Sequence, residues 1–301
     1  MSDSMRLRDP AGLVAVLVVA LSVAGCASTP GHRPPDEVGY PFGGVTHFSE
    51  RRAALLHEAK ERLVAECMAD RGFTYEVSPA VTDGEGPDNP YGLLSPREAR
   101  KNGYGMTMRH VERAEREEKR DERANSRGER WKEALTGTEE HRVSFTTPTG
   151  RTFTYSSDGC VHRARTRLYG KSWYRDFHTV QSLSNRVIRA VTDSEEFEAA
   201  QQRWADCMSS AGHDFDTMQG PLRAVRQALS EQGASREVAD LELSLSRQDA
   251  RCQRRAELPA TVGAVQRRVE SEALPEHRDT LDRLRVSRTE AVARARDIVD
   301  D

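Results

Sequence analysis

The sequence predicts a mainly α fold in which helical units are stapled by disulfides, with one small β-hairpin. Three observations predict it: apolar residues recur at helical spacing along most of the chain, the four cysteines beyond Cys26 form an even set, and a single segment alternates as strands do. Of the 301 residues, 37% are hydrophobic and 31% are charged. Because apolar residues are this sparse, we do not expect a large, multilayered core.

Residues 1–25 have the layout of a secretory signal peptide. Basic residues precede an almost unbroken apolar run over residues 11–24, and small residues then lead to Cys26. The run is shorter than the roughly 18 to 20 apolar residues that a membrane-spanning helix needs, and it ends where a processing site would lie. A signal peptide is therefore favoured over a permanent transmembrane anchor.

The segment 21–26, Leu-Ser-Val-Ala-Gly-Cys, resembles the lipobox of bacterial lipoproteins. The resemblance implies cleavage before Cys26, lipidation of its thiol, and a mature chain held on the extracytoplasmic face of the cell membrane. The alternative is a plain secretory signal in which the cysteine is a coincidence. Residues 26–46 would form a lipid-anchored flexible tether, because their four prolines and four glycines resist helix formation.

The four cysteines beyond the tether belong to two sequence repeats. Cys67 and Cys207 each begin the pattern Cys-Met-x3-Gly-x2-aromatic, 140 residues apart, while Cys160 and Cys252 each begin Cys-x-x-Arg-Ala. An exported chain with an even set of cysteines usually pairs them, and the simplest pairing is Cys67 with Cys160 and Cys207 with Cys252. The alternatives are buried free thiols or a zinc site with four cysteine ligands. The chain has no Cys-x-x-Cys pair, which favours disulfides.

The first Cys-Met unit, residues 47–192, is expected to contain the β-hairpin. Gly72 suits a left-handed C-cap, and Ser95 followed by Pro96 suits the start of a helix. Strand-like alternation flanks a Thr-Pro-Thr-Gly turn. The expected elements are a helix over 50–71, a loop over 78–90, a short helix over 96–101, a charged segment over 109–132 that is a solvated helix or a mobile arm, a hairpin over 142–156, and helices over 158–167 and 173–191.

The second Cys-Met unit, residues 193–301, is expected to contain long C-terminal helices. Ser194 is the expected N-cap of a helix that ends at Gly212. Further helices follow over 221–232, 235–257 and 261–300, the last interrupted at Pro275. Apolar residues in the last stretch follow a heptad that includes Arg288, so it either faces a coiled-coil partner or lies on its own domain. The arginine favours its own domain.

The sequence contains no catalytic constellation. It lacks a His-Glu-x-x-His motif, a Gly-x-Ser-x-Gly elbow, a Ser-x-x-Lys motif and a phosphate-binding loop. Neither a cofactor nor a metal site is predicted. The 45 basic and 48 acidic residues are too balanced for a general nucleic-acid binder. The alternative to a non-catalytic protein is an enzyme that acts on envelope polymers. Its carboxylates, such as Asp83, Glu85 and Asp158, would then be brought together only by the fold.

Tyr91 and Tyr104 each stand beside glycines, in Tyr-Gly-Leu and Gly-Tyr-Gly. Such aromatic residues occur at recognition surfaces, so both are candidate binding residues. The glycines would equally allow these loops to fold back on a core.

The chain resembles a group of actinobacterial lipoproteins of unknown activity over about residues 50–215. The motifs that carry the resemblance are Cys67-Met68…Gly72, Tyr91-Gly92-Leu93, Gly103-Tyr104-Gly105, Gly159-Cys160, Leu168-Tyr169-Gly170 and Trp204…Cys207-Met208…Gly212. The resemblance implies a location in the cell envelope and no particular reaction. We therefore expect a non-catalytic binding or structural module, attached to the membrane through its N-terminal lipid and presented to a protein or cell-wall partner. A transporter's solute-binding lipoprotein would need repeated strand-helix alternation, which one hairpin does not provide.

Overall fold

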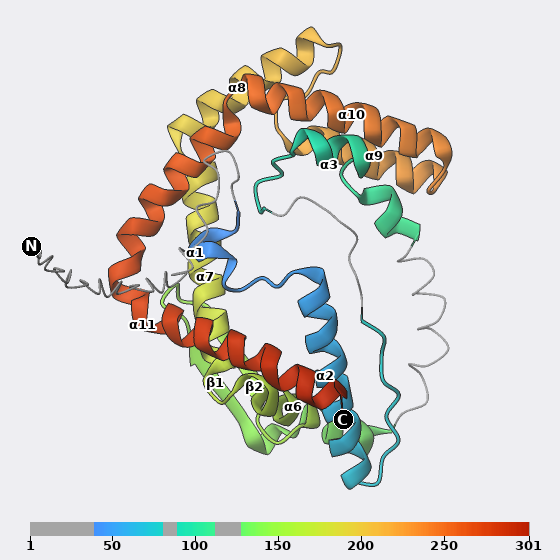
Figure 1. Ribbon diagram of the computed structural model, residues 1–301, viewed down its shortest axis with the longest axis vertical. Helices are drawn as coiled ribbons and strands as arrows, with labels where there is room; N and C mark the ends of the chain where they lie inside the picture. Colours follow the sequence, from blue (N-terminus) through green and yellow to red (C-terminus); the bar gives the residue numbers. More distant parts are fainter. Residues whose placement is uncertain (1–38, 81–88, 112–127, 301) are drawn as a thin grey trace, which may run out of the picture. The chain divides into compact units, whose positions relative to one another are not determined.

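Helices provide most of the regular structure in the computed structural model, which describes residues 39–80, 89–111 and 128–300 (Figure 1). The mainly α prediction is confirmed. In chain order the elements are α1 (Pro41–Gly44), α2 (Glu50–Asp70), α3 (Pro96–Lys101), α5 (Glu129–Thr136), the short 3-10 helix η1 (Glu139–His141), β1 (Arg142–Thr146), β2 (Thr152–Ser156), α6 (Cys160–Tyr169), α7 (Trp173–Thr192), α8 (Glu195–Ser210), α9 (Gln219–Gln232), α10 (Arg236–Arg255) and α11 (Leu258–Asp300).

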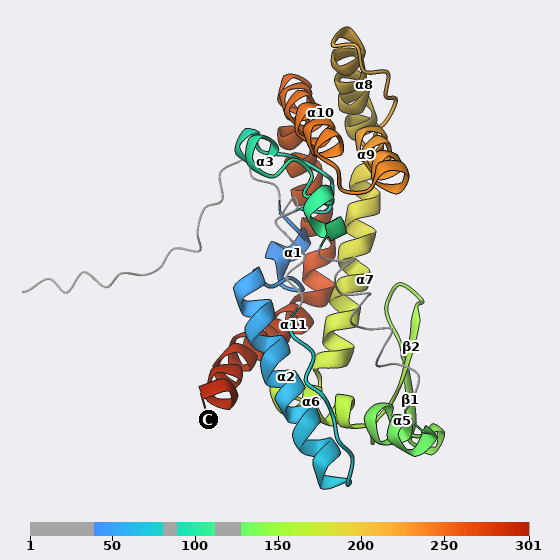
Figure 2. The same cartoon turned by 90° about the vertical axis from the view of Figure 1, so that its right-hand side faces the viewer.

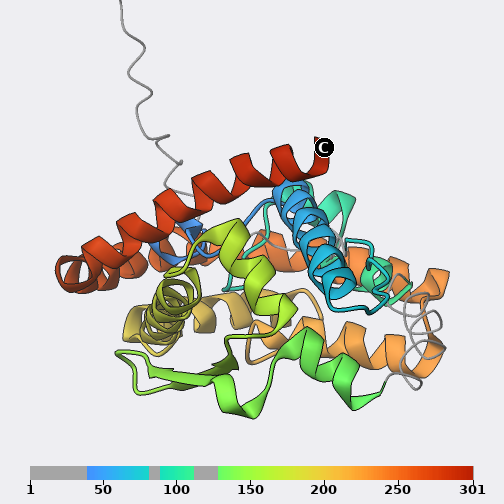
Figure 3. The ribbon, with the colours of Figure 1, turned by 90° about the horizontal axis from the view of Figure 1, so that it is seen from below.

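The predicted hairpin is present as the antiparallel pair β1 and β2, whose register places Phe145 opposite Phe153. The backbone N–H of Gly150 donates to the carbonyl of Thr147 and closes the turn between the strands. The hairpin lies beside α7 (Figure 3). There the Phe145 ring packs edge-on against Tyr174, at 6.0 Å between ring centres. Burial of one aromatic face against a helix stabilises this two-stranded sheet, which would be marginal alone.

The two sequence repeats end their first helices in the same way. At the end of α2 the backbone N–H of Phe73 donates to the carbonyl of Met68, and at the end of α8 that of His213 donates to Met208. Gly72, which directly precedes Phe73, has a φ of +78°. Only glycine adopts this left-handed conformation without strain, so the Cys-Met-x3-Gly pattern specifies where each helix stops.

The predicted helix starts at Ser95 and Ser194 are also confirmed. The Ser95 hydroxyl accepts from the backbone N–H of Glu98, and the Glu98 carboxylate accepts from the backbone N–H of Ser95, which forms a capping box. The Ser194 hydroxyl accepts from the backbone N–H of Phe197. Both serines satisfy amide groups that have no partner inside the helix.

Helix α11 continues through Pro275, where the sequence predicts an interruption. Pro275 is exposed, so water can satisfy the carbonyl that loses its helical partner, and the ring remains inside the helix. Along its length α11 packs against α2, α6, α7, α8 and α10 (Figure 2). The last helix therefore contacts elements of both predicted Cys-Met units.

The interior of the described part of the chain is divided into three apolar clusters. The first joins α7 and α8 to α11, the second joins α2 and α6 to the end of α11, and the third lies among α3, α9 and α10. Each cluster contains side chains with almost no exposed surface, such as Val180, Val64 and Val225. Several small cores agree with the low content of apolar residues.

The N-terminal predictions fall partly outside the described residues. The predicted signal peptide 1–25, Cys26, residues 81–88 of the predicted loop and most of the charged segment 109–132 lie there. Within the predicted tether 26–46, however, residues 41–44 form α1, and Phe42 and Val45 are buried. Packing therefore begins before residue 47, because these two apolar side chains join the first cluster. No helix in the described part of the chain combines the length and apolar character of a membrane span.

Candidate functional site

The four cysteines beyond the tether form two disulfides. Cys67 in α2 is bonded to Cys160 at the start of α6, and Cys207 in α8 is bonded to Cys252 near the end of α10, with Cα–Cα distances of 5.6 and 5.5 Å. The predicted pairing is confirmed, in place of free thiols or a four-cysteine zinc site. Each bond fixes a Cys-Met helix to a later helix of the same repeat.

Tyr91 and Tyr104 are both buried, with 4% and 1% of their surface exposed. Their loops fold back on the core, which was the second interpretation of the neighbouring glycines. Burial raises the pKa of both phenols above the usual range. Neither ring lies on the surface of the described part of the chain, so neither contributes to an exposed recognition patch there.

The Tyr104 hydroxyl donates to the Asp249 carboxylate at 2.9 Å. The indole N–H of Trp204 and the amide of Gln253 also donate to Asp249, each at 2.8 Å. Asp249 is fully buried, and this burial raises its pKa to about 6, although the three hydrogen bonds favour the charged form. Tyr104 and Trp204 lie in the sequence motifs that carry the resemblance, whereas Asp249 lies outside them and was not predicted.

Of the carboxylates suggested for an enzymatic site, Asp158 is the one that the structure describes. Both oxygens of Asp158 are occupied, since they accept from the backbone N–H and the hydroxyl of Thr138 at 3.0 Å each. Asp83 and Glu85 lie outside the described residues. Among the residues described, no group of three or more His, Cys, Asp or Glu is arranged to hold a metal ion.

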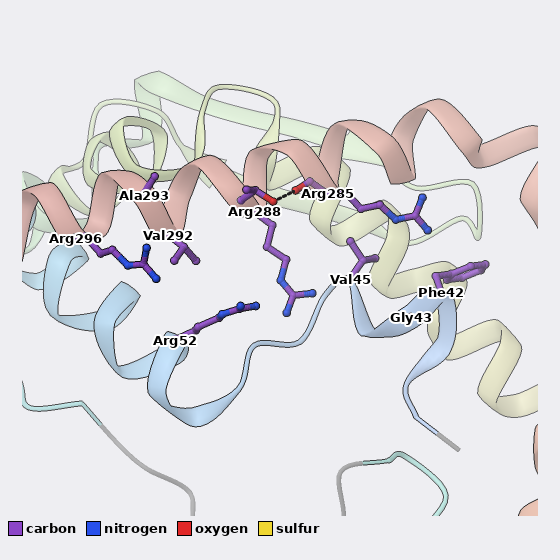
Figure 4. A pocket seen from close by; sticks show the side chains of 10 residues that line it. Phe42, Gly43, Val45, Arg52, Arg285, Arg288, Val292, Ala293 and Arg296 are labelled. Atoms are coloured by element: carbon purple, nitrogen blue, oxygen red, sulfur yellow. Dashed lines mark hydrogen bonds between the residues drawn. The ribbon is translucent and has the colours of Figure 1, made fainter. Parts of the chain in front are cut away.

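A pocket of about 700 Å³ lies between the N-terminal segment and α11 (Figure 4). We call it the arginine pocket, because four arginines and no carboxylate line it. Its lining residues are Phe42, Gly43, Val45, Arg52, Arg285, Arg288, Thr289, Val292, Ala293 and Arg296. This site was not predicted, since its residues come from sequence segments more than two hundred positions apart.

Arg288 occupies the most constrained position among these arginines. Its guanidinium lies 4.4 Å from the centre of the Phe48 ring and donates one hydrogen bond to the carbonyl of Gly44 at 2.8 Å. Burial, together with the positive charge of Arg52, lowers the pKa of Arg288. Figure 4 shows the side chains of Arg52 and Arg288 converging from α2 and α11. Arg285 differs from both, because it pairs with Asp282 at 2.7 Å.

Comparisons of the chain with protein-family models, curated proteins and solved structures find no match. Its function must therefore be argued from its own residues. The features that bear on function are the N-terminal sequence, the two disulfides and the arginine pocket.

Proposed function

We propose that this chain is a cell-envelope lipoprotein, anchored through a lipid on Cys26 to the extracytoplasmic face of the membrane. The main support is the pair of disulfides, because such bonds form and persist in oxidising compartments outside the cytoplasm. The disulfides use all four cysteines beyond the tether, so neither needs Cys26. The lipobox-like segment that ends at Cys26 gives this remaining cysteine a chemical role.

We propose further that the protein is a non-catalytic binding or structural module with a protein or cell-wall partner. The buried Asp249 carboxylate is enclosed by its three donors, and Asp158 is bound by Thr138. These hydrogen bonds support structural roles for both groups. A displayed module would use its surface and its pocket, and the disulfides would preserve its fold outside the cell.

The intact mass of the protein purified from membranes tests the proposal. We expect an N-terminal acylated Cys26, and we expect four alkyl groups to add only after reduction. A matched Cys26→Ser variant should lose the lipid mass while its four other cysteines stay protected. If the thiols alkylate without reduction, the oxidising location is wrong; if Cys26 carries no lipid, the anchor is wrong.

A further inference from the structure

The arginine pocket gathers arginines that lack a carboxylate partner. Three other arginines of α11 pair with carboxylates: Arg268 with Glu196, Arg283 with Asp176 and Arg294 with Glu290, at 2.8 to 3.2 Å. In the pocket, Arg52, Arg288 and Arg296 have no carboxylate within ion-pair distance among the residues that the structure describes. These three positive charges, unlike that of Arg285, are left without a counter-charge from the described chain.

Repulsion between the unpaired arginines destabilises the pocket when no anion is bound there. Arg288 is half-buried and faces the like charge of Arg52, so repulsion acts where water screens poorly. Gly44 and Phe48 are neutral partners that engage one N–H group and one face of the guanidinium. A guanidinium has five N–H donors, and its preferred ligands are planar or tetrahedral oxyanions. A bound oxyanion would supply both the missing charge and the missing acceptors.

The pocket also has apolar walls. Its volume of about 700 Å³ lies in the range of small-molecule sites. Val292 and Ala293 line it beside the guanidinium groups, and the buried side chains of Phe42 and Val45 border it with 4% and 3% of their surface exposed. A site of this composition fits an anionic group that is attached to an apolar one.

We propose that the arginine pocket binds a phosphate-type oxyanion, and that the headgroup of an anionic phospholipid supplies it. Phe42 lies sixteen residues after Cys26, and a chain of that length spans at most about 55 Å. A lipid on Cys26 would thus keep the pocket within reach of the headgroups. The choice of a lipid headgroup rests on the proposed function, whereas the oxyanion chemistry rests on the pocket alone.

The test is a titration of the full chain in an uncharged detergent with inorganic phosphate, with short-chain phosphatidylglycerol and with short-chain phosphatidylcholine. The variant is Arg52→Gln with Arg296→Gln. Both side chains are exposed and neither donates a hydrogen bond to a described residue, so we expect the fold to be retained. The control is Arg247→Gln with Arg278→Gln, which removes two exposed charges from α10 and α11 outside the pocket. Circular dichroism checks that both variants fold.

We expect phosphate and phosphatidylglycerol to bind the natural chain and the control, and phosphatidylcholine to bind neither. Arg52→Gln with Arg296→Gln should weaken the first two ligands about ten-fold or more, because charged hydrogen bonds are lost. If phosphate does not bind, or if the control variant loses as much affinity, the proposal that the arginine pocket binds an oxyanion is wrong. Phosphate binding without preference for phosphatidylglycerol overturns the lipid source. The mass of Cys26 is measured separately, so failure of the anchor leaves the phosphate result interpretable.

Discussion

The Asp249 carboxylate accepts hydrogen bonds from polar groups in three parts of the chain. Tyr104 belongs to the loop after α3, Trp204 belongs to α8, and Gln253 lies one turn along α10 from the carboxylate. A buried carboxylate costs free energy when it is charged, and its donors repay only part of that cost. The raised pKa of Asp249 records this imbalance.

Replacing Asp249 by asparagine should change how stability depends on pH. The native pKa of about 6 lies above the reference value of 3.8, so the native state binds the proton more tightly. Stability from this group is complete below about pH 4 and is lost as the pH rises through about 6, a total of about 3 kcal/mol. Asparagine keeps an acceptor for Trp204 but does not titrate in this range.

The measurement is the free energy of unfolding in urea from about pH 4 to about pH 7. Relative to Asp249→Asn, the natural protein should become progressively less stable with rising pH. The comparison between the two proteins cancels the contribution of other acids, such as Glu61, that are present in both. Parallel stability curves would contradict the prediction.

The apolar heptad residues of α11 pack against other helices of the same chain. Leu281, Leu284, Ala291 and Ala295 have no exposed surface, and they belong to the clusters shared with α7, α2 and α6. The heptad therefore faces its own domain, as the arginine within it favours. Arg288 lies in the same series but borders the arginine pocket.

Leu284→Ala should lower the free energy of unfolding by about 2 to 5 kcal/mol, because it leaves a cavity in a packed interior. Val286 lies two residues away and is 57% exposed, so Val286→Ala should change stability by no more than about 0.5 kcal/mol. Urea denaturation measures both. If the heptad instead faced a second copy of the chain, the loss for Leu284→Ala would depend on protein concentration.

Helix α11 contacts helices of both sequence repeats and so links them. It packs on α2 and α6 of the first repeat and on α8 and α10 of the second, and the residues that the structure describes belong to one compact unit. Opening either repeat would expose apolar surface of this shared helix. The two repeats should therefore unfold together.

Hydrogen exchange in urea tests this cooperativity. We expect α2 and α10 to lose protection at the same urea concentration. Replacing Cys207 and Cys252 by serine removes a cross-link that closes 45 residues, which should destabilise both helices by about 4 kcal/mol through a less constrained unfolded chain. If α2 kept its protection while α10 lost it, the two repeats would be independent folding units.

Local signals in the sequence were sufficient for most of the secondary structure and for the disulfides. Helix ends at Gly72 and Gly212, the capping serine Ser95 and the hairpin turn depend on neighbouring residues, so their physical causes are present in short segments. The cysteine pairs could be predicted because the repeats mark them. The predicted interruption of the last helix at Pro275 is wrong, because the effect of a proline depends on whether the surrounding helix face is exposed.

The tertiary structure alone decided which distant residues meet. Tyr104 lies 145 positions from Asp249, and Arg52 reaches the pocket formed with Arg288 only through the packing of α2 on α11. No periodicity or motif encodes such contacts, because they follow from how complete helices bury their apolar faces. By itself, the sequence determined most of the helices and the disulfide pairs, and it predicts a location in the cell envelope. Packing created the buried Asp249 network and the arginine pocket.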